Sequence, residues 1–279
     1  MSGDTTGELY FFSHTIDDCP PWVDATPALG DLTSNFIRTP THVTIHDLRG
    51  KENSVEIDTN GFEILKYNGS IHDEFDNDSE MQRHCYEEIA ALLKKRLGAS
   101  RVIIFNHVFR FRAVPRTADQ CDENRKNPVY FAHVDNDPPG ARLKVQQVLG
   151  EEEAKKVMQK RLQIINVWRP MGPNPIINIP LTICDYRSLD IDKDIHRAET
   201  RGSSNSSTNY MISCNTQGAQ RWCYLSYMRS DEMFIFKIFD SNPESAQFGA
   251  HTAFINEHAS QTDVEQKSLE MRCLVLYDE

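Results

Sequence analysis

Residues 222–241 read WCYLSYMRSDEMFIFKIFDS, and this stretch decides the fold class. Two runs rich in aromatic and aliphatic residues lie on either side of an acidic turn. Aromatic and β-branched residues favour strands, whereas clustered polar residues favour the connections between them. The stretch therefore predicts two short strands joined by a turn.

Short runs of the same kind recur through the rest of the chain. They read RVIIFNHVFRFR (101–112), LQIINVWRP (162–170), PLTICDYRSL (180–189), NYMISCN (209–215) and KSLEMRCLVLYD (267–278). Many short strands separated by turn signals are typical of a β-sandwich or a β-barrel. We therefore expect a mainly β protein with flanking helices.

Two segments instead show helical patterns. In residues 78–100, Ser79 and Gln82 form a capping box, and Gly98 follows a basic last turn. Residues 138–162 also carry a helical pattern, which we expect to break at Gly150. The polar segment 196–209, HRAETRGSSNSSTN, predicts a flexible loop that orders over a pocket.

Composition sets the class of the protein. A chain of 279 residues suits one large domain, for which we take 1–279, with 1–40 as an N-terminal extension packing on it. The net charge of −11 (30 basic against 41 acidic residues) argues against a nucleic-acid partner. The N-terminal residues lack the pattern of a signal peptide, and no apolar run is long enough to span a membrane. We expect a cytoplasmic protein with its seven cysteines mostly reduced.

The stretch YFAHVDND (130–137) holds the first candidate site residues. In a strand, residues i and i+2 point to the same face, so His133 and Asp135 would project together, about 6–7 Å apart at the backbone. That separation allows both side chains to bind one metal ion. The alternative is a surface strand end that runs into the following loop, NDPPG.

A third ligand is sought among ten histidines. His251 lies between small and apolar residues in AQFGAHTAFI and is preferred over His258, whose surroundings predict an exposed loop. His107 lies within a strand and is expected to be a packed core residue. Two imidazoles and one carboxylate suit a non-haem Fe(II) site with open coordination positions.

Such a site usually needs a cation for the far carboxylate of 2-oxoglutarate, and arginine pairs well with carboxylates. Arg272 lies within the apolar run SLEMRCLVLYD, where a charge requires a partner. A salt bridge to a protein carboxylate is the alternative reading of Arg272. Arg169, in VWRP, is the second candidate for the co-substrate.

Several motifs occur in an order that resembles the fungal family of gibberellin-desaturase-like and cephem-methoxylase-like oxygenases. They are VTIHDLRG, DTNGFEILKY, HVDND, NVWRPMGP, PLTICDYRSL, AHTAF and SLEMRCLVLYD, within roughly residues 40–279. The resemblance implies a double-stranded β-helix (jelly roll, cupin-like), with His133, Asp135 and His251 as iron ligands and Arg272 matching the arginine of the last strand. Where the family usually has an arginine-glutamate-serine run, this chain has EQKS (265–268), which makes Lys267 a rival anchor.

The resemblance also implies a function. It predicts an Fe(II)- and 2-oxoglutarate-dependent dioxygenase that uses O₂ to hydroxylate, desaturate or cyclise a small fungal specialised metabolite through a ferryl intermediate, with a homodimer left open. Five aromatic residues are candidates for an apolar substrate pocket: Phe131, Trp168, Trp222, Tyr224 and Phe254. Two other functions stay open, namely a jelly-roll binding protein with an inactive metal site and a hydrolytic metalloenzyme.

Overall fold

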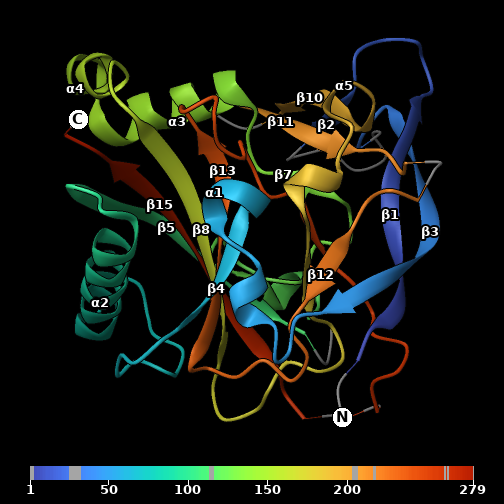
Figure 1. The fold of residues 1–279 in the computed structure, drawn as a ribbon, viewed down its shortest axis with the longest axis horizontal. Helices are drawn as coiled ribbons and strands as arrows, with labels where there is room; N and C mark the ends of the chain where they lie inside the picture. The colour runs from blue at the N-terminus through green and yellow to red at the C-terminus, as the bar shows by residue number, and fades with distance from the viewer. Residues whose placement is uncertain are drawn as a thin grey trace.

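The computed structural model describes residues 3–24, 33–112, 116–202, 207–215, 218–260, 262 and 264–278. Within these residues the chain forms two curled sheets with helices against them (Figure 1). The expectation of a mainly β protein with flanking helices and a jelly-roll architecture is therefore confirmed.

The larger sheet has the order β1-β3-β12-β9-β14-β7-β11-β10-β2. Because the neighbours in this order are rarely consecutive in sequence, the sheet is built by long-range pairing. Its strands are β1 (Thr5–Thr15), β2 (Trp22–Asp24), β3 (Phe36–Asp47), β7 (His133–Val134), β9 (Leu181–Cys184), β10 (Ile195–Arg201), β11 (Ser207–Ile212), β12 (Trp222–Tyr224) and β14 (His251–Ala253).

The smaller sheet has the order β4-β13-β8-β15-β5-β6. Its strands are β4 (Phe62–Lys66), β5 (Arg101–Phe111), β6 (Arg125–Lys126), β8 (Leu162–Met171), β13 (Glu232–Asp240) and β15 (Lys267–Leu276). Every residue of β8 and β13 is buried, because both faces of these central strands are covered. This explains why their sequences are apolar runs without polar alternation.

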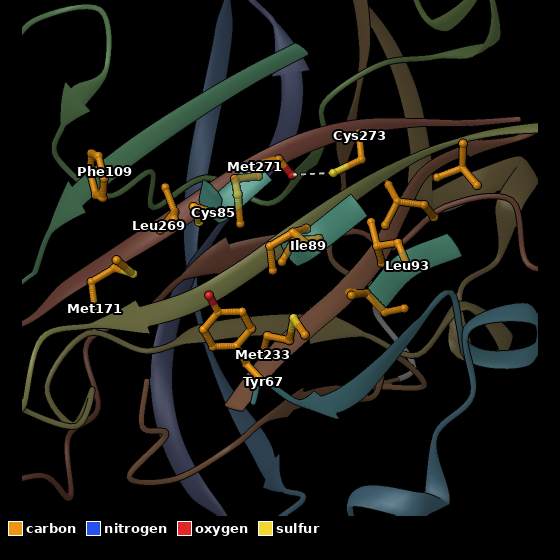
Figure 2. Packing of buried hydrophobic residues seen from close by; sticks show 14 of the residues in the cluster. Tyr67, Cys85, Ile89, Leu93, Phe109, Met171, Met233, Leu269, Met271 and Cys273 are labelled. Atoms are coloured by element: carbon orange, nitrogen blue, oxygen red, sulfur yellow. Dashed lines mark hydrogen bonds between the residues drawn. The ribbon is translucent and has the colours of Figure 1, made fainter. Parts of the chain in front are cut away.

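Helix α2 (Glu80–Leu97) covers the outer face of the smaller sheet (Figure 1). The predicted caps are present, since the Ser79 Oγ accepts a hydrogen bond from the Gln82 N–H at 3.0 Å and Gly98 has φ 68°. Cys85, Ile89 and Leu93 pack into a core with residues of β8, β13 and β15 (Figure 2). Each such fully buried apolar side chain contributes about 1.5–3 kcal/mol, so this stripe fastens the helix.

The second predicted helical segment consists of α3 (Pro138–Leu149) and α4 (Glu151–Val157), separated by Gly150 at φ 78°. The helical structure ends before residue 162, where β8 begins. Both helices pack over the apolar ends of β8, β13 and β15. Two short helices, α1 (Ile57–Asn60) and α5 (Ile191–Asp194), and three 3₁₀ turns at Glu52–Ser54, Ala118–Gln120 and Tyr186–Ser188 complete the described elements.

Residues 1–40 supply strands at the two ends of the larger sheet, since β1 pairs with β3 and β2 pairs with β10. Residues 1–2 and 25–32 lie outside the described residues. No helix in the described part of the chain has the length and apolarity needed to cross a membrane.

The prediction of a flexible loop at 196–209 is wrong for most of that segment. Strands β10 and β11 form an antiparallel ladder that runs from the pair Ile195–Ile212 to the pair Thr200–Ser207. The ladder satisfies the backbone polar groups, so polar side chains do not prevent a regular structure here. Residues 203–206 lie outside the described residues.

Candidate functional site

The two histidines of the predicted triad lie on neighbouring strands of the larger sheet. His251 in β14 is directly opposite His133 in β7, and their ring centroids are 4.5 Å apart. Ala132 and Val134 pack into a core on one face of β7, so His133 points to the opposite face. Residues directly opposite in an antiparallel pair share a face, and therefore both imidazoles point between the two sheets.

Asp135 completes a compact group with these histidines. One ligand atom from each of the three side chains lies within 4.8 Å of the other two. The His133 Nε2 is 3.3 Å from the Asp135 Oδ1, and the side chains of these two residues are only 18% and 13% exposed. His251 is 4% exposed. The three predicted ligands therefore lie together, although β7 ends at Val134 and Asp135 is the first residue beyond the strand.

Backbone carbonyls fix the orientation of both imidazole rings. The His133 Nδ1–H donates to the Phe131 carbonyl at 2.7 Å, and the His251 Nδ1–H donates to the Gly249 carbonyl at 3.1 Å. This tautomer leaves each Nε2 lone pair free for a metal ion. Burial lowers the pKa of His251 to about 4, so its ring is neutral at pH 7.

The carboxylate of Asp135 is held by two donors on the smaller sheet. Its Oδ2 accepts hydrogen bonds from the Arg272 Nε at 3.1 Å and the Asn166 Nδ2 at 2.9 Å. Burial by itself would raise the pKa of Asp135, but the Arg272 charge outweighs it and holds the pKa well below its usual range. The group thus offers one anionic oxygen and two imidazole nitrogens, which fits a divalent iron ion.

A family model described as "Oxidoreductase/YMDC permease-like domain" matches residues 9–276. The chain belongs to this family. One curated relative is the "Fe(II)/2-oxoglutarate-dependent dioxygenase nvfI" of Aspergillus novofumigatus, 28% identical over 90% of this chain and 88% of the relative. Another is the "Hydroxylase/desaturase CTB9" of Cercospora beticola, 29% identical over 85% of this chain and 76% of the relative.

Solved structures agree with these relatives. The structure of the "iron and alpha-ketoglutarate-dependent endoperoxidase NvfI" in a different conformation is similar to this chain with a TM-score of 0.83 and 26% identity. The match covers 99% of this chain and 98% of the other. The protein is therefore an Fe(II)/2-oxoglutarate-dependent dioxygenase, related to fungal enzymes of that class.

Arg272 has protein partners for its charge. Besides Asp135, it donates to the Glu270 Oε1 at 2.7 Å and to the Asn106 Oδ1 at 2.9 Å. Two carboxylates therefore already neutralise the cation that we predicted to hold 2-oxoglutarate. The alternative prediction, a salt bridge to a protein carboxylate, describes what the structure contains.

The other two candidate anchors lie on the opposite face of the smaller sheet. The Arg169 guanidinium lies over the Tyr67 ring, 3.7 Å from its centroid, and contacts Met171, within the core beneath α2 shown in Figure 2. Lys267 pairs with Glu265 at 2.7 Å and with Glu74 at 3.4 Å. The strand alternation that turns Asn166 and Arg272 toward the triad turns these odd-numbered residues away from it. The assignment of Arg169 as a co-substrate ligand is thereby corrected.

The predicted aromatic pocket is mostly core. Trp222, Tyr224 and Phe254 belong to a cluster on the other face of the larger sheet, with Ala132 and Val134. Phe131 stacks on Phe36 with ring centroids 5.6 Å apart. Of the five candidates, Trp168 is the one that shares the interior face of β8 with Asn166.

The remaining histidines discussed above do not join the triad. His107 is buried, and its Nδ1 lies 2.7 Å from the Tyr86 hydroxyl. His258 is exposed, as predicted.

Sequence reasoning missed the polar residues that the smaller sheet contributes to the interior. They are Arg110, Arg112, Asn166 and Glu270. A signal for the first two was available in FRFR (109–112), where arginines alternate with phenylalanines at the period of a strand. Asn166 lies in an apolar run that gives no such signal.

Proposed function

We propose that the protein oxidises a small specialised metabolite at an Fe(II) ion held by His133, Asp135 and His251. One observation carries the proposal. Two imidazole nitrogens from neighbouring strands converge with the ionised carboxylate of Asp135, which directly follows β7, and each ligand is fixed by a further hydrogen bond. Three protein ligands leave coordination positions for a chelating co-substrate and O₂.

When bound, Fe(II), 2-oxoglutarate and O₂ supply the oxidant that attacks a C–H bond of the substrate. The residues of the chain hold and shield the metal site. Asn166 and Arg272 fix the orientation of the Asp135 carboxylate. The Phe236 ring lies 4.6 Å from the His251 ring and covers that ligand with an apolar surface, which limits access of water to the interior.

The finer family and the substrate are also proposals. The ordered motifs of the chain support membership in the gibberellin-desaturase-like and cephem-methoxylase-like group. Relatives named as hydroxylases, desaturases and an endoperoxidase support oxidation of a fungal specialised metabolite. A cytoplasmic location and a homodimer remain predictions.

The test is oxygen uptake by the purified protein with Fe(II), with and without 2-oxoglutarate, in the presence of candidate metabolites. We expect O₂ consumption and succinate formation that both require 2-oxoglutarate and rise with a true substrate. A hydrolytic metalloenzyme would turn over without either co-substrate. Absence of 2-oxoglutarate-dependent O₂ consumption across the metabolites tested, with iron bound, would contradict the proposal.

A further inference from the structure

Arg112 is a buried cation beside the proposed iron site. It follows the last residue of β5, and its backbone N–H donates to the Gln266 carbonyl next to the start of β15. Its Nε donates to the Ser268 Oγ at 2.8 Å, and its Nη1 donates to the Ile179 carbonyl at 2.6 Å. The guanidinium carbon lies 4.8 Å from the centroid of the Trp168 ring.

Unlike Arg110 and Arg272, Arg112 has no carboxylate within hydrogen-bond distance among the described residues, and Glu270 acts on it only through its more distant charge. Arg112 is 2% exposed, and its polar contacts in the described part of the chain are a hydroxyl and a carbonyl, both neutral. By contrast, Arg110 pairs with Glu270, and Arg272 pairs with both Glu270 and Asp135. Burial, with the neighbouring Arg110 charge added, lowers the pKa of Arg112 to about 9. A buried charge without a partner is costly, so this position favours an anionic ligand.

Two residues on one face of β8 connect Arg112 with the triad, and their spacing suits one particular anion. Asn166 contacts Asp135, and Trp168, two residues further along the same face of β8, contacts Arg112. Residues i and i+2 of a strand are separated by about 7 Å, which is comparable to the length of an extended five-carbon dicarboxylate. Two buried polar atoms along this path have no partner, the Asn166 Oδ1 and the Trp168 Nε1.

We propose that Arg112, with the Ser268 hydroxyl beside it, binds the carboxylate of 2-oxoglutarate that is farthest from the metal. This inference rests on the proposed function. The planar guanidinium can pair with a carboxylate through two parallel N–H donors, and Trp168 keeps its plane in place from one side.

The residues around Arg112 explain why the anchor comes from β5. Position 266, in the segment EQKS, holds a glutamine whose Oε1 accepts from the backbone N–H groups of Ile177 at 2.7 Å and Asn178 at 3.2 Å. The amide of Gln266 is thus used to fasten the loop that precedes β9. The neighbouring strand β5 supplies the cation at the same end of the sheet, hydrogen-bonded to Ser268 of that segment.

The test measures binding to the Mn(II)-loaded protein without turnover. Calorimetric titration compares 2-oxoglutarate with 2-oxopentanoate, which has the same chain and metal-chelating end but no second carboxylate. The wild-type protein is expected to bind 2-oxoglutarate about 100-fold more tightly, because an unpaired partner of a buried ion pair costs several kcal/mol. In Arg112→Met this preference should disappear.

Arg169→Met is the matched control, since it removes a buried arginine from the opposite face of the same sheet. It should retain the wild-type preference for 2-oxoglutarate. If Arg112→Met does not fold, Arg112→Lys and Ser268→Ala provide the measurement, each with a reduced but nonzero preference. Mn(II) affinity serves as the check that the triad is intact in every variant.

Two outcomes would overturn the inference, and they are distinguishable. If Arg112→Met keeps the full preference for 2-oxoglutarate while Arg272→Met loses it, the anchor is Arg272 and the proposed function stands. If the wild-type protein binds neither oxo-acid with Mn(II) present, both the inference and the proposed function fail.

Discussion

Replacing His251 by glutamine should abolish metal-dependent stabilisation, whereas the same change at His107 should not. Both histidines are 4% exposed, but only His251 belongs to the triad. His107 contacts Tyr86, Phe75 and Phe109 in the core on the other side of the smaller sheet. The pair therefore separates loss of a ligand from loss of a buried imidazole.

The magnitude follows from binding linkage. At a Mn(II) concentration of 100 times the dissociation constant, wild-type protein is stabilised by about 2.7 kcal/mol. Loss of a residue that only orients a metal ligand weakens metal binding by about 10–100-fold. Loss of the ligand His251 itself should therefore weaken Mn(II) binding by at least about 100-fold. The stabilisation then falls to RT ln 2, about 0.4 kcal/mol. Domains somewhat smaller than this one shift by about 2–4 °C per kcal/mol, so the Mn(II)-induced rise in Tm should drop from about 5–11 °C to about 1–2 °C.

The assay is thermal unfolding by circular dichroism with and without Mn(II) under argon. His107→Gln is expected to lower the Tm of the metal-free protein, because a hydrogen bond to Tyr86 is lost, but to show the wild-type rise on adding Mn(II). A full Mn(II) response in His251→Gln would refute the assignment of this ligand. A lost response in His107→Gln would show that the measurement reports general damage to the core.

Three further predictions follow from other contacts. Asn166→Leu removes a neutral hydrogen-bond donor to Asp135 without changing the charge of the site. It should weaken Mn(II) binding by about 10–100-fold in a titration. Unchanged affinity would show that this hydrogen bond does not position the Asp135 carboxylate. The pKa of Glu232 falls from its ordinary 4.5 to about 2, because the arginine and lysine that pair with it outweigh its burial. Its depressed pKa contributes about 3 kcal/mol of stability that is present above pH 4.5 and is lost as the pH falls toward 2. In chemical denaturation, Glu232→Gln should therefore lose less stability than the wild-type protein between pH 4.5 and pH 2. Equal losses in the two proteins would count against the pairing. Ser79→Ala should cost about 1 kcal/mol of unfolding free energy by urea denaturation, since the Gln82 N–H loses its cap, and no change would indicate that water replaces the hydroxyl.

The sequence by itself determined most of the elements and the chemical type of the site, but it did not reveal the β10–β11 ladder. Runs of aromatic and aliphatic residues between turn signals predicted the strands, and Ser79 with Gly98 predicted the ends of α2, because these signals depend on neighbours along the chain. The close spacing of His133 and Asp135 predicted two neighbouring ligands, which the structure places at the end of β7 and directly after it. The small and apolar surroundings of His251 singled out the third ligand, which pairing of β14 with β7 places beside His133.

The roles of the arginines were decided only by the tertiary structure. Arg169 and Arg272 are both cations in strands that are buried on both faces, so the sequence does not show which face is the interior. Packing of α2 on one face of the smaller sheet and of the larger sheet on the other makes that choice. Arg272 then pairs with Asp135, 137 residues away, while the hydrogen-bond partners of Arg112 are neutral. The net charge around each guanidinium depends on strands that are distant in sequence, and it is this charge that distinguishes a structural ion pair from a site for an anionic co-substrate.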